Sequence, residues 1–138
     1  MPRWFPILIL ALAACAEPFA PPAELEYGVG FGTMPAATRD APAVSGRRGE
    51  ILISGVVPTP NGCQGLRGHV ERDGRELLVR IIARSRAGSP CEEGSTGFAY
   101  QVMARGLERG AYRVRIFHVY EDVEWPASLA FDEVVSVR

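Results

Sequence analysis

From Gly49 to the C-terminus, hydrophobic and polar residues alternate with a period of two, and no segment shows a helical stripe. In the run 75–84, for example, every second residue is Leu, Val, Ile or Ala and shares one face of an extended chain. Turn signals separate such runs, among them the Pro-rich 58–62 and the hairpin dipeptide Asp73-Gly74. Strands are expected at 50–57, 65–72, 75–84, 97–106, 111–121 and 131–137. Six or seven short strands predict an all-β fold, an antiparallel Ig-like β-sandwich of about seven strands formed by residues 49–138.

The hexapeptide 107–112, Leu-Glu-Arg-Gly-Ala-Tyr, has the form L-x-x-G-x-Y. It resembles the tyrosine corner of Ig-like and fibronectin-type sandwiches, in which a Tyr hydroxyl bonds back to the chain a few residues upstream. The resemblance implies that Tyr112 is a structural residue of an Ig-like sandwich. The alternative is a core Tyr that follows an ordinary Gly turn, which is also a structural role.

The N-terminus reads as an export signal rather than as part of the fold. Arg3 precedes the uninterrupted apolar run 7–14, which is too short for a membrane-spanning helix but fits the core of a signal peptide. Residues 12–15, Leu-Ala-Ala-Cys, resemble the lipobox of bacterial lipoproteins. The resemblance implies a signal peptide at 1–14, lipidation (diacylglycerol and a fatty acyl chain such as palmitate) of Cys15, and anchorage in the lipid bilayer. An ordinary secretory signal cleaved near Cys15 is the alternative.

Localisation follows from the same few residues. Ala16 and Glu17 lack the Asp that, after the lipidated Cys, resembles an inner-membrane retention signal. The bacterial cell envelope is therefore expected, at the outer membrane facing the periplasm if the source is Gram-negative. The next stretch, 16–48, carries five Pro among small residues, so 15–48 is expected to be a mostly flexible Pro/Ala-rich tether. Within it, 24–34 alternates apolar and polar residues, and the sequence leaves open whether it adds a strand to the sandwich or belongs to the linker.

Two cysteines remain once the lipidated one is set aside. Cys63 precedes the hairpin around Asp73-Gly74, which places it opposite Arg84, and the chain from there to Cys91 is long enough to double back. In an oxidising compartment this pair is expected to form a disulfide bond that contributes about 3–4 kcal/mol in the chain-entropy model. Free thiols, as a redox pair, are the alternative, although no C-x-x-C spacing favours them.

The span 53–120 resembles a loose class of small bacterial lipoproteins of unassigned activity. They share a Pro-rich stretch that leads to one Cys, a hairpin, a second Cys and then a G-x-Y strand. The resemblance implies an Ig-like fold and brings no catalytic residues with it. His118 and the acidic stretch after it have no counterpart in that pattern.

The net charge and the lack of catalytic motifs exclude further classes of function from the expectation. The 15 basic residues, all Arg, and 16 acidic residues give a net charge of −1, so nucleic acid is not expected as a partner. No catalytic or cofactor motif is present in the sequence, so we expect neither an enzyme nor a cofactor. His69 and His118 lie on separate predicted strands, and His118 follows the inward parity of Tyr112. A capped or edge histidine near the end of the sandwich is expected, the alternative being a shared metal site, for which ligands at local spacing are lacking.

Two surface features are candidates for contacts. The loop 121–126 combines three carboxylates with Trp125, which indicates a solvated loop whose Trp folds over the core, a contact surface, or less favourably a Ca²⁺ site. Four arginines share outward parity on neighbouring strands: Arg80, Arg84, Arg113 and Arg115. They are expected to be offset by Glu71, Glu76 and Glu108, the alternative being a basic stripe for an anionic partner.

These observations predict a membrane-anchored, disulfide-stapled lipoprotein whose sandwich is a non-enzymatic binding or envelope-interaction module, with an envelope protein or glycan as partner. The alternative is an inhibitor of extracytoplasmic proteases that presents the loops 58–62 and 85–92. A third hypothesis is an enzyme or a metal-dependent site that uses His118 with Glu121 and Asp122.

Overall fold

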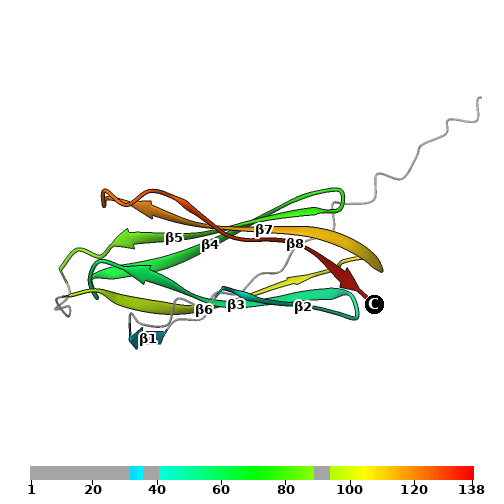
Figure 1. Cartoon of the computed structure of the whole chain (residues 1–138), viewed down its shortest axis with the longest axis horizontal. Coiled ribbons are helices and arrows are strands. Elements are labelled where there is room, and N and C mark those ends of the chain that lie inside the picture. Colours follow the sequence, from blue (N-terminus) through cyan, green and yellow to red (C-terminus); the bar gives the residue numbers. More distant parts are fainter. Residues whose placement is uncertain (1–31, 36–40, 89–93) are drawn as a thin grey trace, which may run out of the picture.

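The structure, a computed structural model, describes residues 32–35, 41–88 and 94–138, which form two β-sheets packed face to face (Figure 1). One sheet contains β1 (Gly32–Pro35), β2 (Ala43–Arg47), β3 (Glu50–Thr59) and β6 (Thr96–Arg105), and the other contains β4 (Gln64–Asp73), β5 (Glu76–Ser85), β7 (Gly110–Glu121) and β8 (Ser128–Val137). The predicted β-sandwich is confirmed. The signal peptide at 1–14, Cys15 and Cys91 lie outside the described residues. Within the described ranges, no helix combines the length and the hydropathy needed to cross a membrane.

The strand order is β1-β6-β3-β2 in one sheet and β4-β5-β7-β8 in the other. Among the described strands five pairs are antiparallel, but β5 and β7 run parallel, from Glu76↔Arg113 to Arg84↔Glu121. The expectation of a fully antiparallel sandwich is wrong for this pair. In an immunoglobulin domain the strand that crosses from the first sheet lies next to the penultimate strand. Here that crossing strand, β4, lies at the edge of its sheet.

The composition of the two hairpin strands explains this order. β5 carries apolar residues on both faces: its inward residues are fully buried, and Leu78 and Ile82 are half-buried on an outer face that also holds Arg80 and Arg84. The outward residues of β4 include Arg67, His69 and Glu71, all exposed. A strand that carries apolar residues on both faces belongs inside a sheet, whereas charged side chains are tolerated at an edge. β5 therefore lies between β4 and β7.

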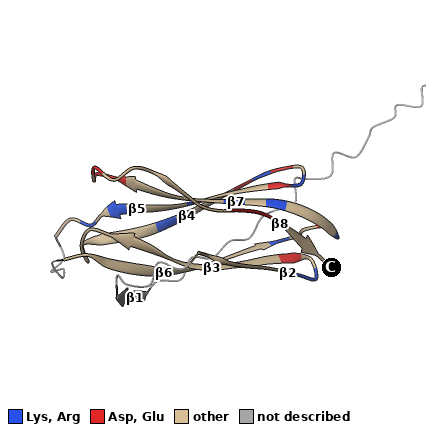
Figure 2. Cartoon of the chain, in the orientation of Figure 1, with Lys and Arg blue, Asp and Glu red and all other residues tan. Residues whose placement is uncertain are grey.

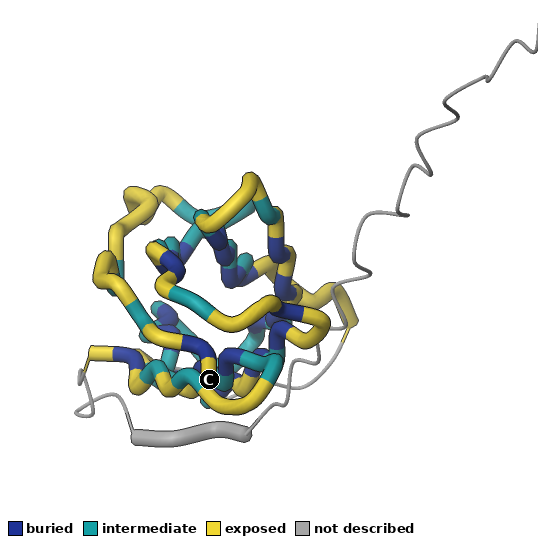
Figure 3. The backbone as a smooth tube through the Cα atoms, turned by 90° about the vertical axis from the view of Figure 1, so that its right-hand side faces the viewer, coloured by how far each residue is buried: buried dark blue, intermediate teal, exposed yellow. Residues whose placement is uncertain are grey.

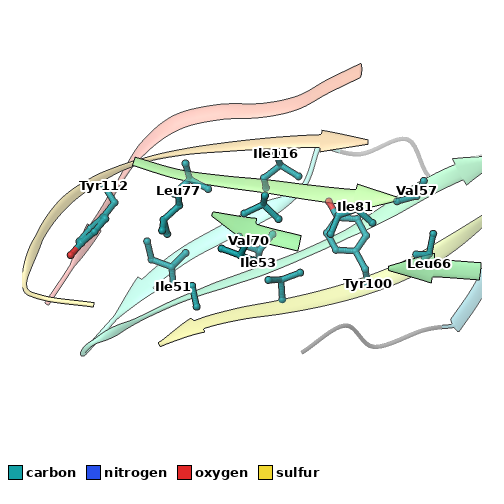
Figure 4. Packing of buried hydrophobic residues seen from close by; sticks show 14 of the residues in the cluster. Ile51, Ile53, Val57, Leu66, Val70, Leu77, Ile81, Tyr100, Tyr112 and Ile116 are labelled. Carbon is teal, nitrogen blue, oxygen red and sulfur yellow. The ribbon is translucent and has the colours of Figure 1, made fainter. Parts of the chain in front are cut away.

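The core fills the space between the sheets. Its largest fully buried side chains come from both layers, with Ile51 and Ile53 from β3, Leu77 and Ile81 from β5, and Tyr112 from β7 (Figure 4). In the end-on view of Figure 3, buried positions alternate with partly or fully exposed ones along the strands. This is the period-two pattern that the sequence predicts, now placed on the facing sides of two sheets.

The sandwich begins before residue 49. Residues 43–47, assigned to the tether from sequence, form β2, and Gly32–Pro35 at the end of the ambiguous segment 24–34 forms β1 at the outer edge of β6. The tether boundary at 48 is therefore wrong. The signal was weak because β2 carries one core-packed apolar side chain, Val44, and a glycine. That glycine is required: a Cβ at Gly46 would collide with the backbone carbonyl of Ser136 in β8.

Tyr112 is fully buried, as its inward position predicts, but the tyrosine corner is not formed. Its hydroxyl has no hydrogen-bond partner among the described residues. Arg75 takes the place that the corner would use: its guanidinium donates to the carbonyl oxygen of Arg109 at 3.1 Å and lies over the Tyr112 ring, 5.1 Å from the centroid. The upstream carbonyl is thus bonded by an arginine instead of the tyrosine. Tyr112 serves as core packing under a cation.

Candidate functional site

An open groove lies at the side of the sandwich where β2 begins, because β2 covers only part of the edge of β3. β2 pairs with β3 only as far as Ala43↔Ser54, so the remaining part of β3 has no strand on that side within the described part of the chain. Ala41 and Pro42 before β2, the end of β3 and the β7–β8 connection surround a space of about 340 Å³. A cavity of this size is in the range that binds small ligands or a few residues of a peptide.

Two aromatic side chains form one wall of the groove. The hydroxyl of Tyr120 in β7 donates to the carbonyl oxygen of Pro58 in β3 at 2.8 Å, which ties the two sheets together beside the groove. The ring of Trp125 packs on that of Tyr120 with centroids 5.4 Å apart and planes at 73°. Trp125 is still 36% exposed. Pro58 and Pro126 add rigid apolar surface next to this pair.

His118 contributes to the groove from inside the sandwich. Its side chain lines the groove, yet the residue is only 6% exposed. The ring nitrogen Nε2 lies 3.1 Å from the hydroxyl of Tyr100, which rises from β6 in the opposite sheet. The two rings meet edge to face, with centroids 5.7 Å apart. Gly55 makes room for this contact, because a Cβ at that position would lie 2.6 Å from the Tyr100 hydroxyl.

Burial keeps both members of this pair neutral. It lowers the pKa of His118 to about 4, because the imidazolium form is poorly solvated between the sheets. The same effect raises the pKa of Tyr100 above its ordinary value. At neutral pH a neutral imidazole and a neutral phenol therefore face each other. The inward position expected for His118 is confirmed, but the residue is buried on the interior strand β7 and does not lie at an edge.

The acidic loop does not join His118. Glu121 lies 3.6 Å from Arg67, and Asp122, which adopts a φ of 66°, lies 3.6 Å from Arg84. In the parts of the chain that the structure describes, no three His, Cys, Asp or Glu residues are grouped to hold a metal ion. The grouping of His118, Glu121 and Asp122 considered from sequence is therefore not found there. The loop instead turns back and lays its Trp beside β7.

The four arginines predicted to share an outer face do so, and each contacts a carboxylate. The pairs are Arg80 with Glu71, Arg84 with Asp122, Arg113 with Asp132 and Arg115 with Glu76. The expected compensation by Glu71 and Glu76 is confirmed, whereas Glu108 pairs with Arg75 at a corner of the sandwich instead. Blue and red segments lie near each other on this layer in Figure 2. The face is a charge-balanced, solvated surface.

Cys63 lies immediately before β4. Its carbonyl oxygen accepts a hydrogen bond of 2.7 Å from the backbone N–H of Arg86, one residue beyond β5. Cys91 follows shortly after Arg86 in the sequence but lies outside the described residues. The Cys63–Cys91 bond therefore remains a prediction. The hydrogen bond from Arg86 holds Cys63 beside the end of β5, from which the chain continues toward Cys91.

Sequence reasoning found His118 and Trp125 but missed their partners. Tyr100 and Tyr120 lie on strands that the alternation predicts, but the sequence did not single them out. Their polar contacts depend on which residues of the opposite sheet face them, and the alternation along one strand does not contain that information. Gly55 within an otherwise β-branched run was the available signal, since a glycine inside a strand often marks the close approach of another group.

Comparisons with models of protein families, with curated proteins and with solved structures give no match for this chain. The description of this protein therefore depends on its own fold and candidate site. The chain forms a two-sheet β-sandwich with an open groove that is walled by aromatic and proline residues and reaches a buried, neutral histidine.

Proposed function

We propose that this chain is an exported bacterial lipoprotein, anchored through Cys15, whose sandwich is a non-enzymatic binding module. The observation that carries the binding role is the groove beside His118, with Trp125 partly exposed on its wall. Exposed Trp and Tyr side chains on rigid supports are typical of contact surfaces. The anchor rests on the resemblance of residues 12–15 to a lipobox and on the apolar run before them.

The surroundings of His118 support binding rather than catalysis. A catalytic histidine acts as a base near neutral pH and is commonly oriented by a carboxylate. His118 instead has a pKa of about 4 and a tyrosine as its described partner, and that tyrosine is made less acidic by burial. Such a pair does not take up protons at neutral pH, but it does present fixed hydrogen-bonding groups.

The disulfide bond between Cys63 and Cys91 belongs to the same proposal. It would join the start of β4 to the connection between β5 and β6, beyond the Cys63–Arg86 hydrogen bond. Such a bond fits an oxidising compartment such as the periplasm, where an outer-membrane lipoprotein that faces inward would reside.

Anchorage is tested by metabolic labelling with an alkyne-tagged palmitate in a bacterial host. The wild-type chain should carry the label and fractionate with membranes, and Cys15→Ser should lose both properties. Cys63→Ser is the matched control, since it also removes one thiol but should keep the label. Label retained on Cys15→Ser would refute the anchor.

The binding role is tested by placing a photo-crosslinking amino acid at Trp125 in the membrane-anchored chain. We expect a discrete cross-linked product from this position in the cell envelope. The control position is Val134, which is 66% exposed on β8 and lies outside the groove. Equal cross-linking from both positions, or none from either, would contradict a binding role for the groove.

A further inference from the structure

Of the polar side chains that line the groove, His118 and Trp125 offer N–H donors, whereas the Tyr120 hydroxyl, whose proton is already used, can only accept. The indole N–H of Trp125 can only donate, and no charged side chain lines the groove within the described residues. The hydroxyl of Tyr120 already donates to a backbone carbonyl. Ser128, exposed at the rim, can donate and accept. The remaining lining residues are Ala, Val and Pro, so the groove offers N–H groups between apolar walls.

The Tyr100 contact fixes which nitrogen of His118 carries the proton. Tyr100 is 3% exposed, and the described partner of its hydroxyl is His118 Nε2. If Nε2 carried the proton and donated to the phenol oxygen, the buried O–H of Tyr100 would be left without an acceptor, which is unfavourable. If the phenol donates to Nε2, both groups are satisfied and the proton of the neutral imidazole resides on Nδ1.

Nδ1 of His118 has no hydrogen-bond partner among the described residues. Because the side chain lines the groove, the arrangement aims a single N–H donor at the groove from a residue that is more than nine-tenths buried. His118 Nδ1 is not among the described buried side-chain atoms that lack a partner, so it is open to water in the groove, and a ligand acceptor can replace that water.

We propose that the groove binds a proline-rich segment of a second polypeptide in the polyproline II conformation, with one segment carbonyl accepting a hydrogen bond from Nδ1–H of His118. This inference rests on the proposed binding function and adds the chemical class of the partner. Proline has no backbone N–H, so such a segment presents carbonyl acceptors and apolar rings. Grooves lined by aromatic residues recognise this preformed, extended helix in other proteins.

Other ligand classes fit the lining less well. A glycan brings many hydroxyl donors, and among the described lining side chains only the hydroxyls of Tyr120 and Ser128 can accept from them. A cationic ligand would need an acidic wall, but the nearby Glu121 and Asp122 contact arginines and do not line the groove. The proline-rich segment matches both the apolar walls and the donor groups.

Tyr100 is a positioning residue in this proposal, because it acts through His118 and does not touch the partner. Removing its hydroxyl frees the imidazole to place the proton on either nitrogen. The contribution of one hydrogen bond predicts that Tyr100→Phe weakens binding about three- to tenfold. The tautomer itself is measurable, because the two ring nitrogens of a neutral histidine have different ¹⁵N chemical shifts.

The test uses the full chain in detergent micelles and an acetylated, amidated peptide with three Ala-Pro-Pro repeats. NMR titration should shift the indole N–H of Trp125 and the ring signals of His118, with a dissociation constant below about 1 mM. A peptide in which Ser replaces every Pro should bind at least tenfold more weakly. The absence of any shift with the proline peptide at several millimolar would overturn the inference, and so would equal binding of the Ser peptide.

The variants separate recognition from folding. Tyr100→Phe should lose the fixed Nδ1–H tautomer together with its affinity, whereas Trp125→Ala should lose affinity and keep the tautomer. His69→Gln, on an exposed edge-strand histidine outside the groove, is the control and should change neither property. Wild-type affinity in both groove variants would overturn the inference.

One further peptide tests the source of the segment. It copies residues 16–24 of this chain, which contain three prolines. If this peptide binds at least tenfold more tightly than the Ala-Pro-Pro peptide, the occupant is the chain's own segment, and the assignment to a second polypeptide is overturned. Similar or weaker binding supports that assignment. Palmitate labelling of Cys15 does not depend on these results, so failure of peptide binding and failure of anchorage are distinguishable.

Discussion

Acidification provides a direct test of the buried histidine, because it changes one group whose surroundings the structure defines. In the folded chain the pKa of His118 is lowered to about 4 by burial, whereas an exposed histidine has a pKa of 6.5. Between these two values the unfolded chain binds a proton at this position and the folded chain does not. Acid therefore shifts the equilibrium toward the unfolded state.

The magnitude follows from the two pKa values. Above 6.5 both states carry a neutral imidazole, so the contribution to stability is fully present. Below that value the free energy of unfolding falls by about 1.4 kcal/mol for each pH unit until the folded-state pKa is reached. At about pH 4.5 the loss should reach about 2–3 kcal/mol, a large fraction of the 5–15 kcal/mol that holds a typical domain together.

The assay is urea unfolding between pH 7.5 and about pH 4.5, followed by circular dichroism. Carboxylates whose pKa is lowered by arginine contacts, such as Glu71 and Asp132, add their own acid sensitivity. The histidine contribution must therefore be taken as a difference between variants. His118→Gln should show an acid-induced loss smaller than that of the wild type by about 2–3 kcal/mol.

Equal acid-induced losses in the wild type and His118→Gln would refute this account of His118. So would an NMR titration in which the C–H signals of His118 change with a midpoint near 6.5. Either result would mean that the ring is solvated, and that the polar pair with Tyr100 is not sealed between the sheets.

Three further predictions concern the stability of the sandwich. Gly46→Ala should destabilise the fold by about 1–3 kcal/mol, because the added methyl group meets the Ser136 carbonyl; thermal unfolding compared with Ser45→Ala on the same strand measures this cost. Cys63→Ser should lower the free energy of unfolding by about 3–4 kcal/mol, and the wild type should run faster in non-reducing than in reducing electrophoresis. A double-mutant cycle on Arg113 and Asp132 should give a coupling below about 1 kcal/mol that declines with added salt, since the pair is exposed despite two contacts of 2.8 Å.

The fold could be predicted from sequence where a local pattern determines it. Alternation from residue 49 onward gave the strands and the buried face of each, because one side of every strand must leave water. The order of the strands within each sheet was harder to predict from the sequence. The hairpin at Asp73-Gly74 is compatible with either of its strands lying beside β7, and the choice depends on the outer face of β5. Leu78 and Ile82 on that face were visible in the sequence, but their meaning depends on which strands flank β5.

The first strands were missed for a related reason. β2 has little apolar surface of its own and is held by pairing with β3 and by a close approach to β8, where the N–H of Arg138 donates to the carbonyl oxygen of Arg47 at 3.1 Å. Such contacts join residues that are far apart in the sequence. Periodicity and propensity describe neighbours in sequence, so a strand stabilised by distant partners reads as linker.

A polar group helps the groove to bind a partner, but a buried polar group can lower the stability of the fold. His118 has both effects. A buried polar group lowers stability unless its hydrogen bonds are made, and here Tyr100 satisfies only Nε2. An apolar residue at position 118 would remove this cost and would also remove the donor aimed at the groove. A ligand acceptor on Nδ1–H completes the polar pair, so binding and folding stability should rise together by mass action. A partner that brings an acceptor for Nδ1–H replaces water at this nitrogen and makes the second hydrogen bond of the imidazole.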